Sequence, residues 1–445
     1  MLVDQGSFRM PILPLILALG LGASVPWAFA EGSSTDGAND LAWGEDSWDQ
    51  PEEGLAWSGF VEALAGGRIH NNPVIASDNT VADIRVRLEA SRYWGNLFFS
   101  AKGDVWYDGT LTNLTGELMD LSLSGQLGDQ MDIKAGRFVS TWGTGDLLFL
   151  NDLFPKDWES FFAGREMDYL KRAANSLKLG YFTSALNVDF VWTPVFEPDN
   201  TLDGQRFSYF SPFTGQETAA PPRMISERPQ KKAGNGEFGL RLSRKVDSVE
   251  WATYLWRGYF KQPLGYDLQL GLPYYPRLNS LGGSVQGNVL AGIFNVEMAW
   301  YHSEEDTSGI DPLVPNSQVR FLVGYQQEVV PRLTGAVQWY AEWTLDHDAL
   351  LRNSLAPQWE PDEWRQVLSM RLTQRMMRDN LILSLMSLYS PTDNDFFVLP
   401  SVSYRFSDSL STELGGRFLG GEEGHTFYGQ HRNNSSLYAR FRARI

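Results

Sequence analysis

The sequence predicts an all-β fold: a single transmembrane, antiparallel, up-and-down β-barrel of about 16 to 18 strands, with about 18 the preferred number. Apolar and polar residues alternate with a period of two over most of the chain after residue 54. Short polar turns alternate with long connections, as in a barrel with one short-turn rim and one long-loop rim. No stretch after residue 30 approaches the roughly 18 consecutive apolar residues of a membrane-spanning helix.

The composition excludes several classes of protein. The 445-residue chain is 43% hydrophobic, which is too apolar for a disordered protein. Aromatic residues make up 13%, and the 42 glycines also exceed average usage, as suits strands, turns and membrane interfaces. The absence of cysteine excludes disulfide scaffolds and cysteine metal sites. The formal net charge of -17 argues against nucleic acid as a partner, since phosphate binding requires clustered Lys and Arg.

Residues 1–30 have the pattern of a cleaved signal peptide, so export through the Sec pathway is expected. Arg9 precedes an apolar run, and Ala28 to Ala30 form the small-x-small pattern of a cleavage site. A membrane anchor is the alternative, but prolines interrupt a run that is shorter than the roughly 20 residues of a span. Residues 31–54 contain acidic residues and no basic one, which predicts a disordered leader.

Residues 55–445 are expected to form the barrel. Between 82 and 91, Ile84, Val86 and Leu88 alternate with Arg85 and Arg87, and residues 333–346 alternate in the same way. Both runs reach the roughly 9 to 11 residues of a tilted transmembrane strand. A soluble β-sandwich would also give strands with one apolar and one polar face. The lengths of the connections between strands must therefore distinguish a membrane barrel from a soluble sandwich.

Short turns and longer connections alternate strictly along the chain. Short polar turns are expected near 93–96, 127–130, 183–187, 245–248, 286–288, 330–332, 377–380 and 406–409. Longer connections are expected near 70–79, 109–116, 140–175, 196–235, 262–277, 302–316, 347–363, 390–395 and 420–434. This asymmetry is typical of outer-membrane barrels and places both ends of the barrel on the short-turn side.

Two further patterns support membrane insertion. The last strand alternates up to Ile445 and resembles the C-terminal signal by which the barrel-assembly machinery recognises its substrates, although most such signals end in Phe. We therefore expect this machinery, outer-membrane lipid and lipopolysaccharide as partners, and the sequence leaves the oligomeric state open. Aromatic residues near expected strand ends are candidates for two interfacial girdles: Tyr93, Trp94, Trp106, Tyr107, Trp192, Trp251, Trp256, Tyr259, Trp300, Tyr301 and Trp364.

The polar strand faces give a candidate pore lining of both signs of charge. Such charges can make a pore selective, or they can pair across neighbouring strands and hydrate the wall, and the pairing interpretation is preferred for most positions. The basic candidates are Arg85, Arg87, Lys102, Lys134, Arg137, Arg241, Arg257, Arg320, Arg371, Arg375, Arg405 and Arg417. The acidic candidates are Asp104, Asp120, Asp132, Asp189, Glu297 and Glu342.

The connection at 140–175 is a candidate inward-folded loop. It contains a cluster of leucine, phenylalanine and tryptophan residues among charges, and an exposed loop of this composition would form an apolar surface patch. Folding into the lumen would make it the constriction, whereas packing over the barrel mouth or against a partner is the alternative. The charges that would line a constriction are Asp152, Lys156, Asp157, Glu159, Arg165, Glu166 and Asp168.

Three segments carry a resemblance to a known family. The segments GRFVSTWGTGDLLFLNDLFPKDW (136–158), VWTPVFEPDN (191–200) and WRGYF (256–260) resemble porin-like outer-membrane β-barrels of Gram-negative bacteria, a mostly uncharacterised family. The similarity to alginate-export barrels is more distant and concerns strand number and a charged lumen. The resemblance implies an outer-membrane barrel and a role in transport.

No catalytic, cofactor-binding or metal-binding site is expected. All five histidines fall in expected loops, and the sequence Asp346-His347-Asp348 has no recognisable partner nucleophile. The predicted function is therefore a porin-like channel for small polar or charged solutes, or the outer pore of an export or uptake system. The alternative is a closed barrel with a loop-mediated binding, adhesion or structural role.

Overall fold

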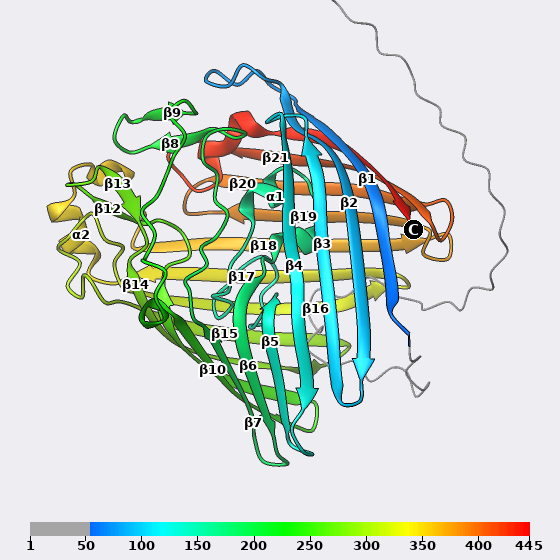
Figure 1. Ribbon diagram of the computed structural model, residues 1–445. Helices are drawn as coiled ribbons and strands as arrows, with labels where there is room; N and C mark the ends of the chain where they lie inside the picture. The colour runs from blue at the N-terminus through cyan, green and yellow to red at the C-terminus, as the bar shows by residue number, and fades with distance from the viewer. Residues whose placement is uncertain (1–53) are drawn as a thin grey trace, which may run out of the picture. The chain divides into compact units, whose positions relative to one another are not determined.

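The computed structural model describes residues 54–445 as a closed antiparallel barrel of 18 strands, which confirms the predicted fold class and strand number (Figure 1). Each barrel strand pairs with the barrel strands before and after it in the sequence. The last strand closes the ring by pairing with the first, from Phe60 with Arg444 to Arg68 with Ser436. The expected signal peptide and nearly all of the acidic leader lie outside the described residues.

Just over half of residues 54–445 are in barrel strands, which are joined by loops of unequal length. The barrel strands are β1 (Ala56–Arg68), β2 (Asn79–Trp94), β3 (Leu97–Asp108), β4 (Asn113–Gln126), β5 (Met131–Phe138), β6 (Ala174–Phe182), β7 (Asn187–Thr193), β10 (Glu237–Val246), β11 (Val249–Tyr259), β14 (Arg277–Val289), β15 (Gly292–Ser303), β16 (Gln318–Val330), β17 (Leu333–Thr344), β18 (Trp364–Met376), β19 (Leu381–Ser390), β20 (Asp395–Arg405), β21 (Leu410–Gly421) and β22 (Ser436–Arg444). The loops contain the hairpins β8 (Tyr209–Ser211) with β9 (Gln216–Thr218) and β12 (Gly265–Asp267) with β13 (Leu272–Tyr274). They also contain the helices α1 (Trp158–Phe162) and α2 (His347–Asn353) and the 3₁₀ turns η1 (Met167–Leu170), η2 (Ala233–Asn235), η3 (Pro357–Trp359) and η4 (Gly429–Asn434).

The period-two pattern fixes which side chains face the lumen. On β2, Ile84 and Leu88 are 60% and 56% exposed on the outer face, whereas Arg85 and Arg87 are 2% and 3% exposed on the inner face. Successive side chains of a strand point to opposite faces, so an apolar outer band and a polar interior follow directly from the alternation. Among residues 54–445, no helix is long and apolar enough to cross a membrane.

The alternation of short and long connections holds around most of the ring. The connections expected to be long near 109–116 and 390–395 are wrong, because β3 and β4 are joined by residues 109–112 and β19 and β20 by residues 391–394, links as short as turns of the opposite rim. One expected short turn is also displaced. Residues 286–288 were predicted as a turn, but Gly287 and Asn288 pair with Phe294 and Ile293 inside the β14–β15 ladder. The chain reverses instead at Leu290, which has a φ of +56°. The prediction failed because glycine and asparagine, although common in turns, also fit the solvated end of a strand.

The predicted aromatic girdles are only partly correct. Trp94, Tyr107 and Trp300 are exposed on the outer wall, whereas Trp106 and Tyr301 are buried in the interior. Neighbouring aromatic residues on one strand point to opposite faces, so Trp106–Tyr107 and Trp300–Tyr301 each contribute one outer and one inner ring. The candidates Trp256 and Tyr259 are also buried.

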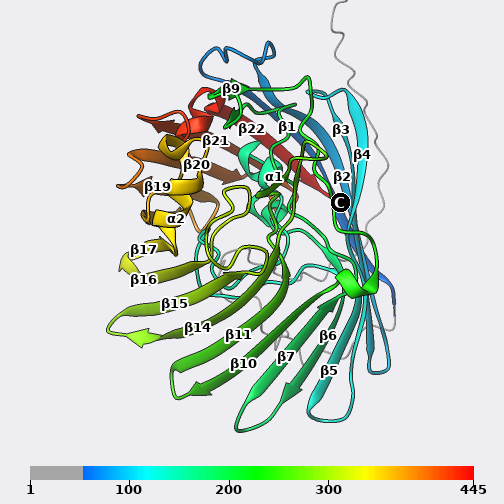
Figure 2. The same cartoon turned by 90° about the vertical axis from the view of Figure 1, so that its left-hand side faces the viewer.

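The largest buried apolar cluster lies inside the barrel rather than in its wall. Leu150, Phe161 and Phe162 of the connection between β5 and β6 pack with residues such as Tyr340 of β17 and Phe397 of β20. Figure 2 shows α1, which belongs to this connection, surrounded by the strands. We call residues 139–173 the lumen loop.

Candidate solute pathway

The first arm of the lumen loop extends across the barrel to β18. Asp146 forms an ion pair with Arg371 of β18, which lies half-way round the ring of 18 strands from β5, where the loop begins. The backbone N–H of Asp146 also donates to Oε1 of Gln338 on β17, at 3.0 Å. The loop is therefore attached to the wall opposite its own origin.

Glu297 of β15 organises the bend in this arm. Its carboxylate accepts hydrogen bonds from the backbone N–H of Thr144 and from Nδ2 of Asn151, the latter at 3.0 Å. Gly143 has a φ of +82°, and an ideal Cβ at this position would lie 3.1 Å from Oε1 of Glu297. The glycine in the WGTGD segment therefore lets the loop bend and approach the carboxylate closely.

The second arm of the loop is held by β2, β21 and β22. Nε of Arg165 lies 2.7 Å from Oδ2 of Asp83, and Nη2 of Arg440 donates to the carbonyl of Gly164, also at 2.7 Å. Nη2 of Arg442 lies 2.5 Å from Oε2 of Glu166. Charged side chains of the wall thus neutralise loop charges and satisfy loop carbonyls, which stabilises polar groups in the barrel interior.

The other charges predicted for the constriction have defined positions. Lys156 Nζ lies 3.0 Å from Oδ1 of Asp152 within the loop. Oδ1 of Asp157 accepts a hydrogen bond from the backbone N–H of Ser160 at 2.9 Å, so this carboxylate caps the short helix α1. Glu159 Oε1 lies 3.1 Å from Nε of Arg206, and burial raises the pKa of Glu159 despite that partner.

Asp168 differs from these residues because it is exposed. Among the described residues it forms no ion pair, whereas the other six charges each bond to a loop or wall group. Most charges of the lumen loop are therefore bonded, some within the loop and others to the wall or to Arg206.

Most of the predicted wall charges are paired across neighbouring strands. Arg85 Nη1 and Arg87 Nε each lie 2.7 Å from a carboxylate oxygen of Asp104, and all three side chains are buried. The other cross-strand pairs are Lys102 with Glu89 at 3.2 Å, Lys134 with Asp120 at 3.5 Å, Lys178 and Arg241 with Asp189 at 3.3 Å, and Arg320 with Glu342 at 3.3 Å. Arg417 donates from Nε to the carbonyl of Phe161 at 3.1 Å. Asp132, Arg375 and Arg405 occupy inward positions near the short-turn ends of β5, β18 and β20.

Two predicted lining residues occupy outward positions. Arg257 is exposed on β11 in phase with Trp251 and Leu255, whereas the alternate residues are buried. Arg137 pairs in register with Leu121 and Asn175, both exposed, so its backbone position is also on the outer face, whereas its guanidinium lies 3.9 Å from the carboxylate of Glu197 in a long loop. The assignment of Arg257 to the lumen was wrong because aromatic and small residues occur on both faces of β11 and obscure the period.

Several charged residues of the interior were missed in the sequence. Glu62 of β1 accepts a hydrogen bond from Nε of Arg442 at 2.9 Å. It was missed because its neighbours on the inward face, Phe60 and Leu64, are apolar, so the sequence of β1 shows no polar face there. Arg365 of β18 forms a pair with Asp393, with 2.7 Å between Nε and Oδ2. Arg365 is two residues from Val367 and four from Ser369, both of which face inward, so the period of two was a usable signal.

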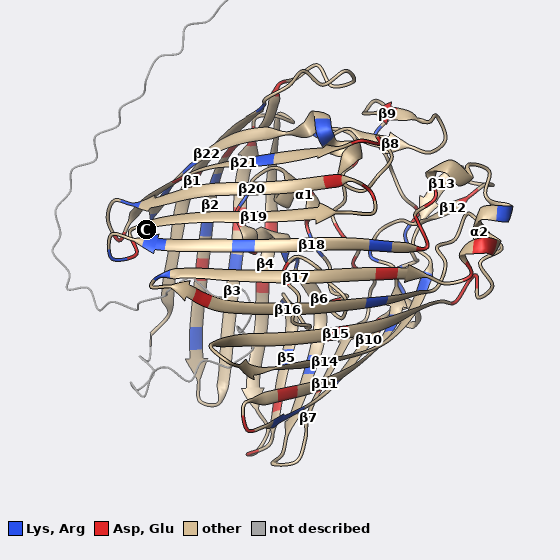
Figure 3. Ribbon diagram, turned by 180° about the vertical axis from the view of Figure 1, so that it is seen from behind, with Lys and Arg blue, Asp and Glu red and all other residues tan. Residues whose placement is uncertain are grey.

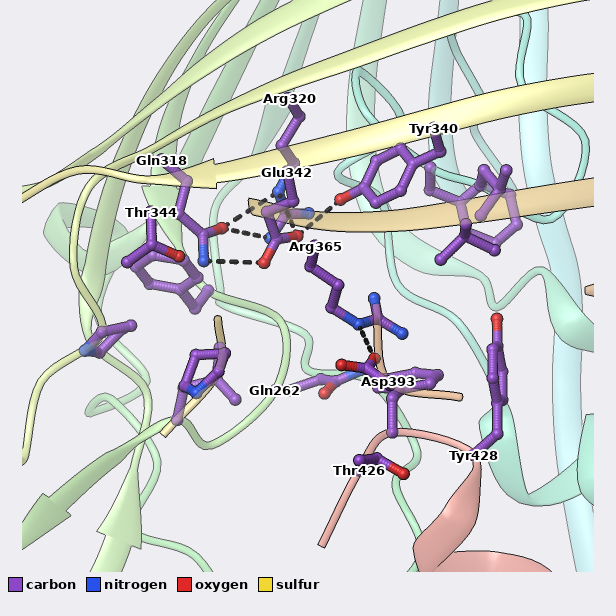
Figure 4. A pocket seen from close by; sticks show the side chains of 18 of the residues that line it. Gln262, Gln318, Arg320, Tyr340, Glu342, Thr344, Arg365, Asp393, Thr426 and Tyr428 are labelled. Carbon is purple, nitrogen blue, oxygen red and sulfur yellow. Dashed lines mark hydrogen bonds and ion pairs between the residues drawn. The ribbon is translucent and has the colours of Figure 1, made fainter. Parts of the chain in front are cut away.

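A cavity of about 890 Å³ lies between the lumen loop, the inner wall and the long loops. Its wall side contains a polar network in which Tyr340 donates its hydroxyl to Glu342 Oε2 at 2.6 Å and Gln318 donates to Oε1 at 3.1 Å (Figure 4). Its apolar surface includes Phe149, Trp158, Phe161, Tyr301 and Phe397. Volume, aromatic surface and a few fixed polar groups are the usual properties of a small-molecule site.

Within residues 54–445, no group of three or more His, Asp or Glu side chains is arranged to hold a metal ion. Nε2 of His347 lies 2.9 Å from the carbonyl of Pro361, and Nδ1 of His431 lies 3.0 Å from that of Ser208. These two imidazoles therefore contact backbone carbonyls.

No protein family and no curated protein matches the chain by sequence. Solved structures of porins have a similar fold. A BenF-like porin from Pseudomonas fluorescens Pf-5 has a TM-score of 0.54 at 10% identity, over 88% of this chain and 98% of that one. OccAB4 of Acinetobacter baumannii has a TM-score of 0.52 at 10% identity, over 90% and 99% of the two chains. OccD3 (OpdP) of Pseudomonas aeruginosa has a TM-score of 0.51 at 10% identity, over 89% and 92%. The chain therefore has a porin-like barrel fold.

Proposed function

We propose that this protein is a channel of the Gram-negative outer membrane that passes small polar or charged solutes, with the lumen loop as its constriction. The observation that carries the proposal is the tether between Asp146 and Arg371, which holds the loop across a barrel of 18 strands. A barrel of this size has a lumen wide enough for water, so a loop inside it determines the free cross-section.

The charged interior supports the same function. Ion pairs such as Arg320 with Glu342 and Lys134 with Asp120 line the wall with fixed charges of both signs. Fixed charges along a narrow pore favour polar solutes over apolar ones and give a channel its selectivity. One of the proteins with a similar fold is a BenF-like porin, which supports a channel for this chain.

Location and assembly belong to the same proposal. Export would use the signal peptide at residues 1–30, and insertion would use the last strand, β22, which ends one residue before Ile445. The apolar outer face would contact lipid, and the long loops would contact lipopolysaccharide at the cell surface. A single channel or the outer pore of a larger export or uptake system are both compatible with this arrangement.

Single-channel conductance in a planar bilayer tests the proposal. We expect stable conductance from the refolded protein and a larger conductance when residues 146–170 are replaced by a short Gly-Ser linker, because the linker cannot fill the lumen. Arg257→Gln on the outer wall is the matched control and should leave the conductance unchanged.

The alternative function is a closed barrel that binds or adheres through its loops. It is favoured by the extent of apolar packing between the lumen loop and the wall, for example of Phe162 against Phe397 with ring centroids 5.4 Å apart. Conductance only after replacement of the loop would support this alternative. If neither the wild type nor the loop-replacement variant conducts, although both are verified to be inserted in the bilayer, the proposed channel function is contradicted.

A further inference from the structure

All four Lys and Arg side chains that line the cavity are neutralised by a carboxylate. Lys156 lies 3.0 Å from Asp152, and Lys261 lies 2.5 Å from Glu237. Arg320 and Arg365 lie 3.3 Å and 2.7 Å from the carboxylates of Glu342 and Asp393. A negatively charged solute would therefore have to compete with a protein carboxylate for each cation.

Acidic side chains at the mouth of the same cavity have no basic partner. Glu360, Asp362, Glu422 and Glu423 line the cavity, and within residues 54–445 none of them forms an ion pair. Glu360 accepts a hydrogen bond from the hydroxyl of Ser354 at 2.5 Å, which leaves its charge in place. The cavity therefore has an excess of negative charge on its entrance side.

The long loops around this entrance add to the negative charge. The loop at 304–317 contains Glu304, Glu305, Asp306 and Asp311 and no Lys or Arg. The loop at 345–363, which includes α2, contains acidic residues and a single basic residue, Arg352. Figure 3 shows acidic residues in this region beside α2. A concave site whose entrance carries an excess of one sign of charge raises the local concentration of solutes of opposite sign.

The interior of the cavity is suited to an apolar body that carries a cation. Aromatic rings line it, among them Trp158, Tyr301, Phe397 and Phe427. Aromatic faces attract cations through their quadrupole, and the ring of Phe427 already lies 5.0 Å from the guanidinium carbon of Arg365. The rings also bury apolar surface of a ligand.

One buried acceptor in the lining has no partner. Asn316 is 4% exposed, and its Nδ2 donates to the carbonyl of Leu345 at 2.7 Å. Its Oδ1 is buried and accepts no hydrogen bond from the described residues. A buried carbonyl oxygen without a donor is destabilised, and an N–H group of a bound ammonium ion is a donor that would satisfy it.

We propose that this cavity binds organic ammonium ions with an apolar body about the size of a single aromatic ring. This assignment rests on the proposed channel function and names the class of solute that the channel would take. The acidic entrance would attract the ion, the rings would accommodate its body, and Asn316 would accept from its N–H. Anions of the same shape would meet uncompensated carboxylates at the entrance and bind less well.

The test compares two probes that share a phenylethyl body, 2-phenylethylammonium and 3-phenylpropanoate. Block of single-channel current is measured with each probe added on the long-loop side, and binding to the protein in detergent is measured separately by saturation-transfer NMR. Ethylammonium, which lacks the ring, is the control for charge alone. We expect 2-phenylethylammonium to block and bind at a concentration about tenfold lower than either of the other ions.

Two variants with equal charge changes locate the effect. The first carries Glu360→Gln, Asp362→Asn, Glu422→Gln and Glu423→Gln at the cavity mouth. The second carries Asp129→Asn, Asp247→Asn, Asp379→Asn and Asp408→Asn, which are exposed residues of short turns on the opposite rim. We expect the first variant to lose about tenfold in the affinity for 2-phenylethylammonium and the second to keep it. In both variants the barrel wall and the lumen loop are unchanged, so folding should be unaffected.

The outcomes separate the two proposals. A conducting protein that favours 3-phenylpropanoate, or shows no preference, overturns the cation site and leaves the channel intact. Equal loss of affinity in both variants also overturns it, because the effect would then be a property of the overall charge. A protein that binds 2-phenylethylammonium selectively but does not conduct overturns the channel and keeps the site.

Discussion

Nε of Arg165 in the lumen loop lies 2.7 Å from Oδ2 of Asp83 on β2, and the two side chains are 4% and 1% exposed. A second carboxylate, that of Asp108, lies 3.6 Å from Nη2 of the same arginine. Both charges are shielded from water inside the barrel, so each depends on nearby opposite charges for compensation, and the closest of these is its partner in the pair. This ion pair joins the loop to the wall and makes the position of the loop part of the folded structure.

Removal of one partner of this pair should loosen the loop. Arg165→Leu leaves Asp83 buried with Arg85, at 3.9 Å, as its one remaining ion-pair partner within residues 54–445. We therefore expect the free energy of local opening of residues 158–170 to fall by about 3 kcal/mol. Hydrogen exchange of the amides in that segment measures the change. The double variant Arg165→Leu with Asp83→Leu should recover part of the loss, since no lone charge remains. Equal exchange in the wild type and Arg165→Leu would contradict the anchoring role.

The tether between Asp146 and Arg371 should control how steadily the loop narrows the lumen. Arg371→Asp places two carboxylates together. We expect this change to favour the detached position of the loop tip by about 1 kcal/mol, which raises the population of that position roughly fivefold. The measurement is the frequency of current flicker in single-channel records. The charge-swapped double variant, Asp146→Arg with Arg371→Asp, should return flicker toward the wild-type level. Flicker that is the same in all three proteins would show that this pair does not hold the loop.

The inward and outward arginines of neighbouring strands should differ in their effect on ion selectivity. Arg241 of β10 faces the lumen, whereas Arg257 of β11 faces outward. Arg241→Gln removes a positive charge next to Asp189 and should shift the reversal potential in a salt gradient toward cations. Arg257→Gln removes the same charge outside the lumen and should leave the reversal potential unchanged. A shift of equal size in both variants would contradict the assignment of the two faces.

Packing among the long loops should weaken on acidification because of His431. Burial lowers the pKa of His431 to about 4, from an ordinary value of 6.5. The folded state therefore binds this proton less readily than the unfolded state. The full stability contribution is present above pH 6.5 and is lost progressively as the pH falls to about 4, by on the order of 3 kcal/mol.

Hydrogen exchange of residues 422–435 measures this loss. His431→Gln is compared with the wild type at each pH, which removes the intrinsic pH dependence of exchange. We expect the wild type alone to lose protection between pH 6.5 and 4, because its imidazole packs against Phe162 with ring centroids 5.0 Å apart. A parallel loss in the variant would assign the effect to other groups.

The barrel and its polar interior could be predicted from the sequence. Alternation of residues such as Ile84 and Arg85 is a local property, because the geometry of a single strand sends successive side chains to opposite faces. The strand number and the asymmetry of the rims followed from counting turns and loops. Arg257 was misplaced because β11 carries residues of mixed character on both faces, so the local period could not assign a side.

The arrangement of the pathway was decided by the tertiary structure. Arg165 and Asp83 are 82 positions apart in the sequence. Glu297 is 153 positions from Thr144, whose backbone N–H donates a hydrogen bond to the Glu297 carboxylate. Nothing in either local sequence indicates these partners, because barrel closure and the path of the lumen loop bring them together. The sequence by itself determined the alternation of the strands and the inward face of most of them, since both depend on the local strand period. Only the closed ring decided which charges are neutralised and which face the cavity, since pairing depends on distances between strands that are remote in the chain.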